Sequence, residues 1–472
     1  MDAQSKQTDF ISVAIPGSKS LSHRYLIGAG LAKGKSVLSH VQDSADITVT
    51  KRLLQQLGVE IVKQDEETLI VTGIDGKVRG GEGSPMECNV EESGTTCRLM
   101  SAVLAAGNGL FRIYGSGRMS ERPCEDLCNA LTRLGAGVCY TGKSGCPPFL
   151  LQARGLDPDL VKGELSIGMD SSSQYFSGLL LAAPLSNKDL VLELGGKKAV
   201  SWPYVSLTLA CLSDYGLHFT VETRQNAGSP WQRLEEGAWR EIAMVEPGCL
   251  RITVEKGSYR AGNFTVEGDW SSASYFLAAG ALGKKGVCLK GLREDSLQGD
   301  RIFLDILCKM GAEVKSTSDS VCVFPSPLHG VDLDMGYSPD LVPTVAVMAA
   351  FAHGSTRIRN VAHLKLKETD RIAASAKELN RIGVIVDTLS DGLLINGRGD
   401  HISHKIGHAH LPVLAEHEQF ECHNDHRIAM SLALLDVVNP DLHVQTRLDA
   451  PDCVGKSFPT FWELWDQVRQ CQ

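Results

Sequence analysis

The sequence predicts an α/β protein built from six similar units in two domains. The chain has 472 residues, more than one hydrophobic core normally holds, so at least two domains are expected. Two patterns recur along it. One is a helix that ends just before a strand, as in "LLQQLGVEI", "ALTRLGAGV", "CLSDYGLHF", "ILCKMGAEV" and "ELNRIGVIV", with "LWDQVRQ" closing the chain. The other is a polar cluster before an apolar helix, which recurs at Ser18, Gly94, Ser172, Ser271, Asp340 and Asp425.

The polar clusters at these helix starts predict a site for anions. Small hydroxyl and acidic residues suit a helix N-cap, because they accept hydrogen bonds from the first N–H groups. The clusters also hold the cations Lys19, Arg24, Arg98 and Arg427. A cation opposes the partial positive charge of a helix N-terminus unless an anion lies there. Equivalent units would point their helix N-termini the same way, so we expect negatively charged ligands.

The composition narrows the class of protein. The net charge is −9, from 47 Lys and Arg against 56 Asp and Glu, which argues against nucleic acid as a partner but permits a local cationic pocket. The start, "MDAQSKQTDF", lacks the signal-peptide pattern, and no apolar run has the length of a membrane span. We therefore expect a cytoplasmic protein that binds no membrane. The 14 cysteines include no CxxC pair and favour reduced thiols over a disulfide framework or a structural zinc.

Three other features carry no predicted chemistry. The triplets Gly34–Ser36 and Gly455–Ser457 lack the earlier glycine of a phosphate-binding loop, so ATP chemistry is not supported. Residues 401–426 hold seven histidines, but without the ligand spacing of a zinc site, which favours a solvated loop and no metal. An insertion near 222–246 contains Trp231 and Trp239 and is predicted to be a surface excursion.

Eight motifs together carry a resemblance to a known family. They are "PGSKSLSHR", "ESGTTCRLM", "RMSERP", "SSSQYFSGLL", "DWSSASYFLAAGAL", "KETDR", "NDHRIAM" and "KSFPTFWE". These motifs occur in the order found in the 5-enolpyruvylshikimate-3-phosphate synthase family, and the chain resembles that family over nearly its whole length. The resemblance implies the enolpyruvyl transferase fold, with two domains of three βαβαββ units each. These would be residues 20–266, which include the insertion, and residues 1–19 plus 267–472, with the active site in the cleft between them.

The same resemblance implies a transferase. Its reaction moves the enolpyruvyl group of phosphoenolpyruvate to the 5-hydroxyl of shikimate 3-phosphate and releases phosphate, by addition and elimination through a tetrahedral ketal. This is a step of the shikimate pathway, which leads to chorismate and the aromatic amino acids. The resemblance implies no metal and no organic cofactor, and we expect a monomer.

The resemblance also assigns roles to residues. Asp340 would take the proton from the attacking hydroxyl, Glu368 would deliver and later remove a proton at the methylene carbon, and Lys19 would stabilise charge on oxygen. The residues implied for phosphoenolpyruvate are Lys19, Gly94, Arg122, Gln174, Arg371, Arg427 and Lys456. Those implied for shikimate 3-phosphate are Ser20, Arg24, Ser172, Ser173, Gln174, Ser201, Tyr204, Asp340, His363 and Lys367.

Some positions depart from the family pattern and leave alternatives open. Glu91 and Glu92 stand where the family normally has Gly-Asn, His363 where an Asn is common, and Trp202 where a Lys is common. One alternative is an enolpyruvyl transferase with a different acceptor. The one acting on UDP-N-acetylglucosamine usually has a cysteine a few residues before the loop arginine, and "GSGRMSE", which precedes Arg122, contains none. The other is a non-catalytic paralogue that binds phosphorylated ligands, which the presence of the catalytic carboxylates opposes.

Overall fold

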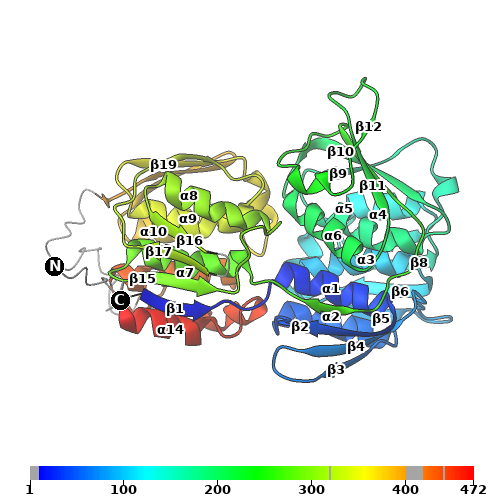
Figure 1. Cartoon of the computed structure of the whole chain (residues 1–472), viewed down its shortest axis with the longest axis horizontal. Coiled ribbons are helices and arrows are strands. Elements are labelled where there is room, and N and C mark those ends of the chain that lie inside the picture. The colour runs from blue at the N-terminus through cyan, green and yellow to red at the C-terminus, as the bar shows by residue number, and fades with distance from the viewer. Residues whose placement is uncertain (1–9, 318–319, 400–417, 440–441) are drawn as a thin grey trace, which may run out of the picture. The chain divides into compact units, whose positions relative to one another are not determined.

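The chain folds into two compact units, which we number as the structure divides them. The computed structural model describes residues 10–317, 320–399, 418–439 and 442–472 (Figure 1). Unit 1 comprises Met1–Pro16, Glu267–Ser296 and Asp300–Gln472, and unit 2 comprises Gly17–Val266 and Leu297–Gly299. The chain thus enters unit 2 before Gly17, and Lys19 is in unit 2.

Unit 2 contains the first six helices. They are α1 (Lys19–Leu31), α2 (Ala45–Gln56), α3 (Gly94–Ala105), α4 (Glu125–Arg133), α5 (Gln174–Ala182) and α6 (Pro203–Asp214). Its strands are β2 (Lys33–Ser39), β3 (Glu60–Lys63), β4 (Leu69–Ile74), β5 (Met86–Asn89), β6 (Asn108–Tyr114), β7 (Gly137–Tyr140), β8 (Phe149–Arg154), β9 (Leu165–Met169), β10 (Leu190–Ala199), β11 (Phe219–Thr223), β12 (Gln232–Arg233), β13 (Leu250–Val254) and β14 (Asn263–Thr265).

Unit 1 is formed by the chain's beginning and its second half. Its helices are α7 (Trp270–Leu282), α8 (Phe303–Lys309), α9 (Val342–Ala350), α10 (Arg371–Arg381), α11 (His426–Ala433), α12 (Leu435–Val438), α13 (Val444–Arg447) and α14 (Phe461–Cys471). Its strands are β1 (Phe10–Ala14), β15 (Gly286–Lys290), β16 (Glu313–Ser316), β17 (Ser320–Phe324), β18 (Asp332–Asp334), β19 (Ser355–Arg359), β20 (Ile385–Leu389) and β21 (Gly392–Asn396).

One pattern of strand pairing repeats through both units and confirms the predicted α/β class. The sheets of the described residues have the orders β14-β2-β4-β3, β5-β6-β8-β7, β9-β10-β13-β11-β12, β1-β15-β17-β16 and β18-β19-β21-β20. In each, the first two strands are parallel and the later neighbours are antiparallel. In three of these sheets a helix that begins near a polar cluster connects the two parallel strands: α3 between β5 and β6, α5 between β9 and β10, and α9 between β18 and β19. Part of the last predicted unit, including His401, His404, His408, His410 and His417, lies outside the described residues.

The first helix of each repeat is a buried helix that begins at or just after one of the polar clusters. Helices α1, α3 and α5 in unit 2 and α7, α9 and α11 in unit 1 are enclosed along most of their length. Their Ala-, Gly- and Leu-rich sequences have no polar face, as is typical of core helices. The N-caps Ser93, Asp269 and Asp425 accept hydrogen bonds from backbone N–H groups of the first turn. Two of these first turns also carry a cation, Lys19 in α1 and Arg427 in α11.

The insertion near 222–246 packs against the sheet that contains β11. Strand β12 pairs with β11 at its outer edge (Figure 1). Trp239 is buried and meets Phe219 edge-on at 5.7 Å between ring centroids. The indole Nε1 of Trp202 donates to the carbonyl of Ile242 at 3.0 Å. Trp202 is one of the departures from the family pattern, and its hydrogen bond connects the insertion to the start of α6.

The cysteines differ from the expectation in one place. Cys288 of β15 and Cys322 of β17 are directly opposite in the antiparallel pair and form a disulfide. Reduced thiols were expected because nothing in the sequence shows that these strands are neighbours. The other cysteines of the described chain are free, and most of them are buried.

We predict that Gly178→Ala destabilises unit 2. A Cβ at Gly178 of α5 would lie 2.8 Å from the carbonyl oxygen of Arg98 in α3, too close for a real contact, so the two helices must separate. Overpacking of this kind lowers the free energy of unfolding by about 1–3 kcal/mol, measurable by urea denaturation. Gly83→Ala is the matched control, because nothing lies within 4 Å of its added Cβ. Equal stability of the two variants would contradict the close approach of α3 and α5.

Candidate active site

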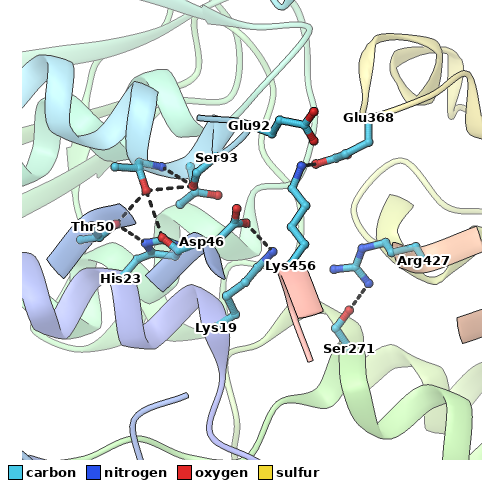
Figure 2. A network of polar contacts seen from close by, with 12 residues as sticks. Lys19, His23, Asp46, Thr50, Glu92, Ser93, Ser271, Glu368, Arg427 and Lys456 are labelled. Carbon is cyan, nitrogen blue, oxygen red and sulfur yellow. Dashed lines mark hydrogen bonds and ion pairs between the residues drawn. The ribbon is translucent and has the colours of Figure 1, made fainter. Parts of the chain in front are cut away.

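Lys19 is held at the start of α1 by a carboxylate of α2. Its Nζ donates to Asp46 Oδ2 at 3.0 Å, and the two side chains are only 15% and 7% exposed (Figure 2). Asp46 lies in the first turn of α2, where a negative charge is favourable. The pair keeps an ammonium group at a helix N-terminus that would otherwise repel it.

Arg24 is enclosed in unit 2 and most of its donors bind the protein itself. Its guanidinium donates to Thr208 Oγ1 at 2.8 Å, to the carbonyl of Ser20 at 2.7 Å and to the carbonyl of Tyr204 at 2.9 Å. Burial lowers the pKa of Arg24 to about 10, which leaves it charged at neutral pH. Arg24 therefore joins the start of α1 to the start of α6, and Ser20 and Tyr204 are brought together through it.

The N-terminus of α3 is lined by an arginine and a glutamine. A Cβ added at Gly94 would lie 2.5 Å from Arg122 Nη2, so only glycine lets this guanidinium approach the helix end so closely. Gln174 donates to Thr95 Oγ1 at 2.9 Å and accepts from Arg98 at 2.9 Å. Gly94, Arg122 and Gln174, three of the residues predicted for phosphoenolpyruvate, are thus neighbours in unit 2.

Serines begin the next two helices of unit 2. Ser173 is the N-cap of α5 and is buried, and Ser172 Oγ accepts from the N–H of Gln174 at 3.2 Å. Ser201, just before α6, has a positive φ of 56°, which is strained for a residue other than glycine. The fold therefore places the predicted serine donors at helix ends, where backbone N–H groups also lie.

The two glutamates that depart from the family pattern have different surroundings. The carboxylate of Glu91 binds Arg52 of α2 at 2.6 Å. The side chain of Glu92 lies against Gly117, and its backbone carbonyl accepts from Arg122 at 3.4 Å. The N-cap of α3 is the next residue, Ser93, so the Glu92 side chain does not cap this helix.

In unit 1, a buried arginine gathers three carboxylates. Arg371, the first residue of α10, is 2% exposed. It donates to Asp425 at 2.8 and 3.2 Å, to Asp340 at 3.0 Å and to Glu368 at 3.0 Å. Glu368 also lies 3.5 Å from Lys456 Nζ (Figure 2). The two carboxylates predicted to be catalytic therefore share one guanidinium.

Arg427 completes this cluster. From the first turn of α11 it donates to Asp340 Oδ2 at 2.9 Å and to Ser271 Oγ (Figure 2). Burial alone would raise the pKa of Asp340, but the charges of Arg427, Lys367 and Arg371 hold it well below its usual range. Asp340 is consequently ionised at neutral pH, with each of its oxygens bound by a different arginine.

A fourth acid in unit 1 went unrecognised in the sequence. Asp300 is 4% exposed, and burial, together with the negative charge of Asp340, raises its pKa to about 7.

Among the predicted residues, His363 is also buried, on the 3₁₀ turn Ala362–Leu366. No group of His, Cys, Asp and Glu that could hold a metal ion occurs among the residues the structure describes. In the same part of the chain, no helix has the length and apolarity needed to cross a membrane.

Comparisons with known proteins bear on the family and the fold of the chain. A family model described as EPSP synthase (3-phosphoshikimate 1-carboxyvinyltransferase) matches residues 8–240 and 243–465. The curated 3-phosphoshikimate 1-carboxyvinyltransferase of Shewanella sediminis is 35% identical over 460 residues, 97% of each chain. That of Mannheimia haemolytica is 36% identical over 463 residues, 97% of this chain and 96% of the other. The solved EPSP synthase of Acinetobacter baumannii has the same fold, with a TM-score of 0.70 and 24% identity over 97% of this chain and 95% of the other.

We predict a pH-dependent contribution of Asp300 to stability. Its folded pKa of about 7 exceeds the unfolded value, so its contribution is fully present below about pH 4 and is lost as the pH rises to about 7. The variant Asp300→Asn has no carboxyl group to ionise at this position, so it should not lose stability in this way as the pH rises. The difference in unfolding free energy between variant and wild type should shift in favour of the variant between pH 5 and pH 8, by on the order of 1–4 kcal/mol.

Urea denaturation at both pH values measures this shift. Asp305→Asn is the control, because Asp305 is an exposed acid on the neighbouring α8. The same shift in both variants, or none in Asp300→Asn, would contradict the raised pKa.

Proposed function

The chain belongs to the EPSP synthase family, and from this we propose that it is a 3-phosphoshikimate 1-carboxyvinyltransferase. It transfers the enolpyruvyl group of phosphoenolpyruvate to the 5-hydroxyl of shikimate 3-phosphate and releases phosphate, in the shikimate pathway. One observation carries the proposal furthest: Asp340 and Glu368, an acid–base pair, share the buried guanidinium of Arg371. An addition to a vinyl carbon needs a base for the attacking hydroxyl and an acid for the carbon.

The arginines link substrate binding to the chemistry. Arg371 and Arg427 form ion pairs with Asp340, which makes that carboxylate a weak base. A substrate carboxylate or phosphate competes for the same guanidinium donors, since bidentate binding of such oxygens is what arginine provides. As the donors turn to the substrate, the pKa of Asp340 rises and it can accept the proton of the hydroxyl.

The second carboxylate and the lysine complete the reaction. Glu368, between Arg371 and Lys456, delivers a proton to the methylene carbon and removes it in the elimination. Lys19, freed from part of its pairing with Asp46 by an anionic ligand, stabilises charge on the reacting oxygen. No cofactor is needed for these steps.

Residues of both units act on the same two substrates in this proposal. Phosphoenolpyruvate binds Lys19, Gly94, Arg122, Gln174, Arg371, Arg427 and Lys456. Shikimate 3-phosphate binds Ser20, Ser172, Ser173, Gln174, Ser201, Tyr204, Asp340, His363 and Lys367. Arg24, whose donors bind Ser20, Thr208 and Tyr204, acts by holding these neighbours for the shikimate phosphate.

The remaining parts of the proposal concern the whole protein. The proposed three-repeat domains, 20–266 and 1–19 plus 267–472, differ from units 2 and 1 at residues 17–19 and 297–299, which belong to unit 2. The protein works as a cytoplasmic monomer and has no nucleic-acid partner, in keeping with its net charge of −9.

We predict that loss of one catalytic charge abolishes most turnover. Lys19→Met, Arg122→Ala and Glu368→Gln should each lower phosphate release from the two substrates by at least about 100-fold, as expected when a contact to the transition state is removed. Glu368→Gln removes a charged partner of Arg371 and should lower stability, so each variant is assayed below its own unfolding temperature, as checked by circular dichroism. Lys35→Met is the matched control, because Lys35 is exposed on β2 of the same unit. Wild-type turnover in Lys19→Met or Glu368→Gln would refute the assigned roles, and ligand-induced stabilisation of the wild type without phosphate release would indicate a binding protein.

We also predict that Glu92 weakens phosphoenolpyruvate binding. Its carboxylate lies beside the loop that carries Arg122, and a charge there opposes an anionic substrate by on the order of 1 kcal/mol. Glu92→Gln keeps the shape and should lower the KM for phosphoenolpyruvate about threefold to fivefold, with the KM for shikimate 3-phosphate unchanged. Glu91→Gln is the control, since Arg52 already neutralises Glu91. Identical kinetics in both variants would show that the charge of Glu92 does not repel bound phosphoenolpyruvate.

A further inference from the structure

A chain of buried polar side chains connects the first three helices of unit 2. His23 Nδ1 of α1 lies 2.8 Å from Thr50 Oγ1 of α2, which lies 2.7 Å from Thr96 Oγ1 of α3 (Figure 2). Thr96 Oγ1 in turn lies 2.8 Å from Ser93 Oγ. All four side chains are at most 1% exposed. Hydrogen bonds of this kind in a low-dielectric interior fix the groups that they join.

The row of hydrogen-bonded side chains His23, Thr50, Thr96 and Ser93 lies beside the ion pair of Lys19 and Asp46. Lys19 and His23 are one turn apart on α1, as are Asp46 and Thr50 on α2. The contacts Lys19–Asp46 and His23–Thr50 are therefore successive rungs between the same two helices. Thr96 adds a bond to the carbonyl of Asp46 at 3.4 Å, so α3 is tied to the rung that carries Lys19.

His23 is neutral in this environment. Burial lowers its pKa to about 3, and the positive charges of Lys19 and Arg24 act in the same direction while Asp46 opposes them. A neutral imidazole can donate to or accept from the Thr50 hydroxyl, as can each hydroxyl further along the chain. The hydrogen bonds between His23, Thr50 and Thr96 are thus compatible with neutral pH, without an uncompensated buried charge on His23.

At its other end the chain holds the N-cap of α3. Ser93 Oγ accepts from the N–H of Thr96 at 3.3 Å, and the Thr96 hydroxyl contacts the same oxygen. The next residue is Gly94, which lies against the guanidinium of Arg122. A shift of this turn therefore moves Gly94 and Arg122 relative to Lys19.

We propose that His23, Thr50 and Thr96 are positioning residues for phosphoenolpyruvate: their buried contacts fix the first turn of α3, with Gly94, against the Lys19 end of α1. The proposal rests on the function given above and adds the elements that align its phosphoenolpyruvate ligands. None of the three residues needs to touch the substrate. They act through Ser93 and Asp46, and small misplacements of binding groups cause large losses of rate or affinity.

The test removes one hydroxyl without changing the shape of its side chain. Thr96→Val should raise the KM for phosphoenolpyruvate about tenfold, with a smaller fall in kcat and with the KM for shikimate 3-phosphate within about twofold. Thr96→Ser keeps the hydroxyl and should restore the KM. Thr50→Val interrupts the same chain and should give the same selective rise, and the Thr50→Val/Thr96→Val double variant should be no worse than the poorer single one.

The control separates positioning from stability. Thr356→Val removes another fully buried hydroxyl, which accepts from the N–H of Val331 in unit 1, and should lower Tm without changing either KM. An unchanged KM for phosphoenolpyruvate in folded Thr96→Val or Thr50→Val would overturn the proposal, as would equal rises for both substrates. Absence of phosphate release in the wild type would instead refute the proposed function, so the two failures are distinguishable.

Discussion

A buried guanidinium must be paired, and in unit 1 this constraint organises the site. Arg371 is 2% exposed and is bound by Asp425, Asp340 and Glu368. Removal of one partner from a buried ion cluster is strongly destabilising, whereas the complete cluster roughly balances the loss of hydration. The 3₁₀ turn Pro339–Leu341 and the starts of α10 and α11 are therefore held at fixed places by one side chain. The two carboxylates proposed to be reactive, Asp340 and Glu368, are therefore aligned in the structure without a substrate.

The same constraint shapes unit 2 in a different way. Arg24 is satisfied mainly by carbonyl and hydroxyl oxygens, whereas Lys19 is satisfied by the carboxylate of Asp46. Carbonyl oxygens leave the net charge of Arg24 intact, and Asp46 neutralises Lys19. The first arrangement provides a permanent positive charge within the unit, and the second provides a lysine that can exchange its partner.

The sequence was informative where the signal is local. Polar first turns before apolar helices predicted the places where Lys19, Gly94, Ser173 and Arg427 lie, because capping chemistry acts within three residues. Pairs that are far apart along the chain left no such signal. Arg371 and Asp425, which are 54 residues apart, and the opposed Cys288 and Cys322 became visible only when the strands and helices were assembled. The raised pKa of Asp300 likewise depends on burial, which a single sequence does not reveal.

The bond from Trp202 to the insertion bears on how this protein can be shortened. A trimmed version that lacks residues 224–246 would leave the indole N–H without the acceptor at Ile242, and the ring of Phe219 would lose its cover from Trp239. Trp202 immediately follows Ser201 and precedes α6, so a minimal scaffold would have to be redesigned beside a proposed ligand of the substrate. The surface segment, to which no chemistry is assigned, thereby supports the proposed binding site through Trp202.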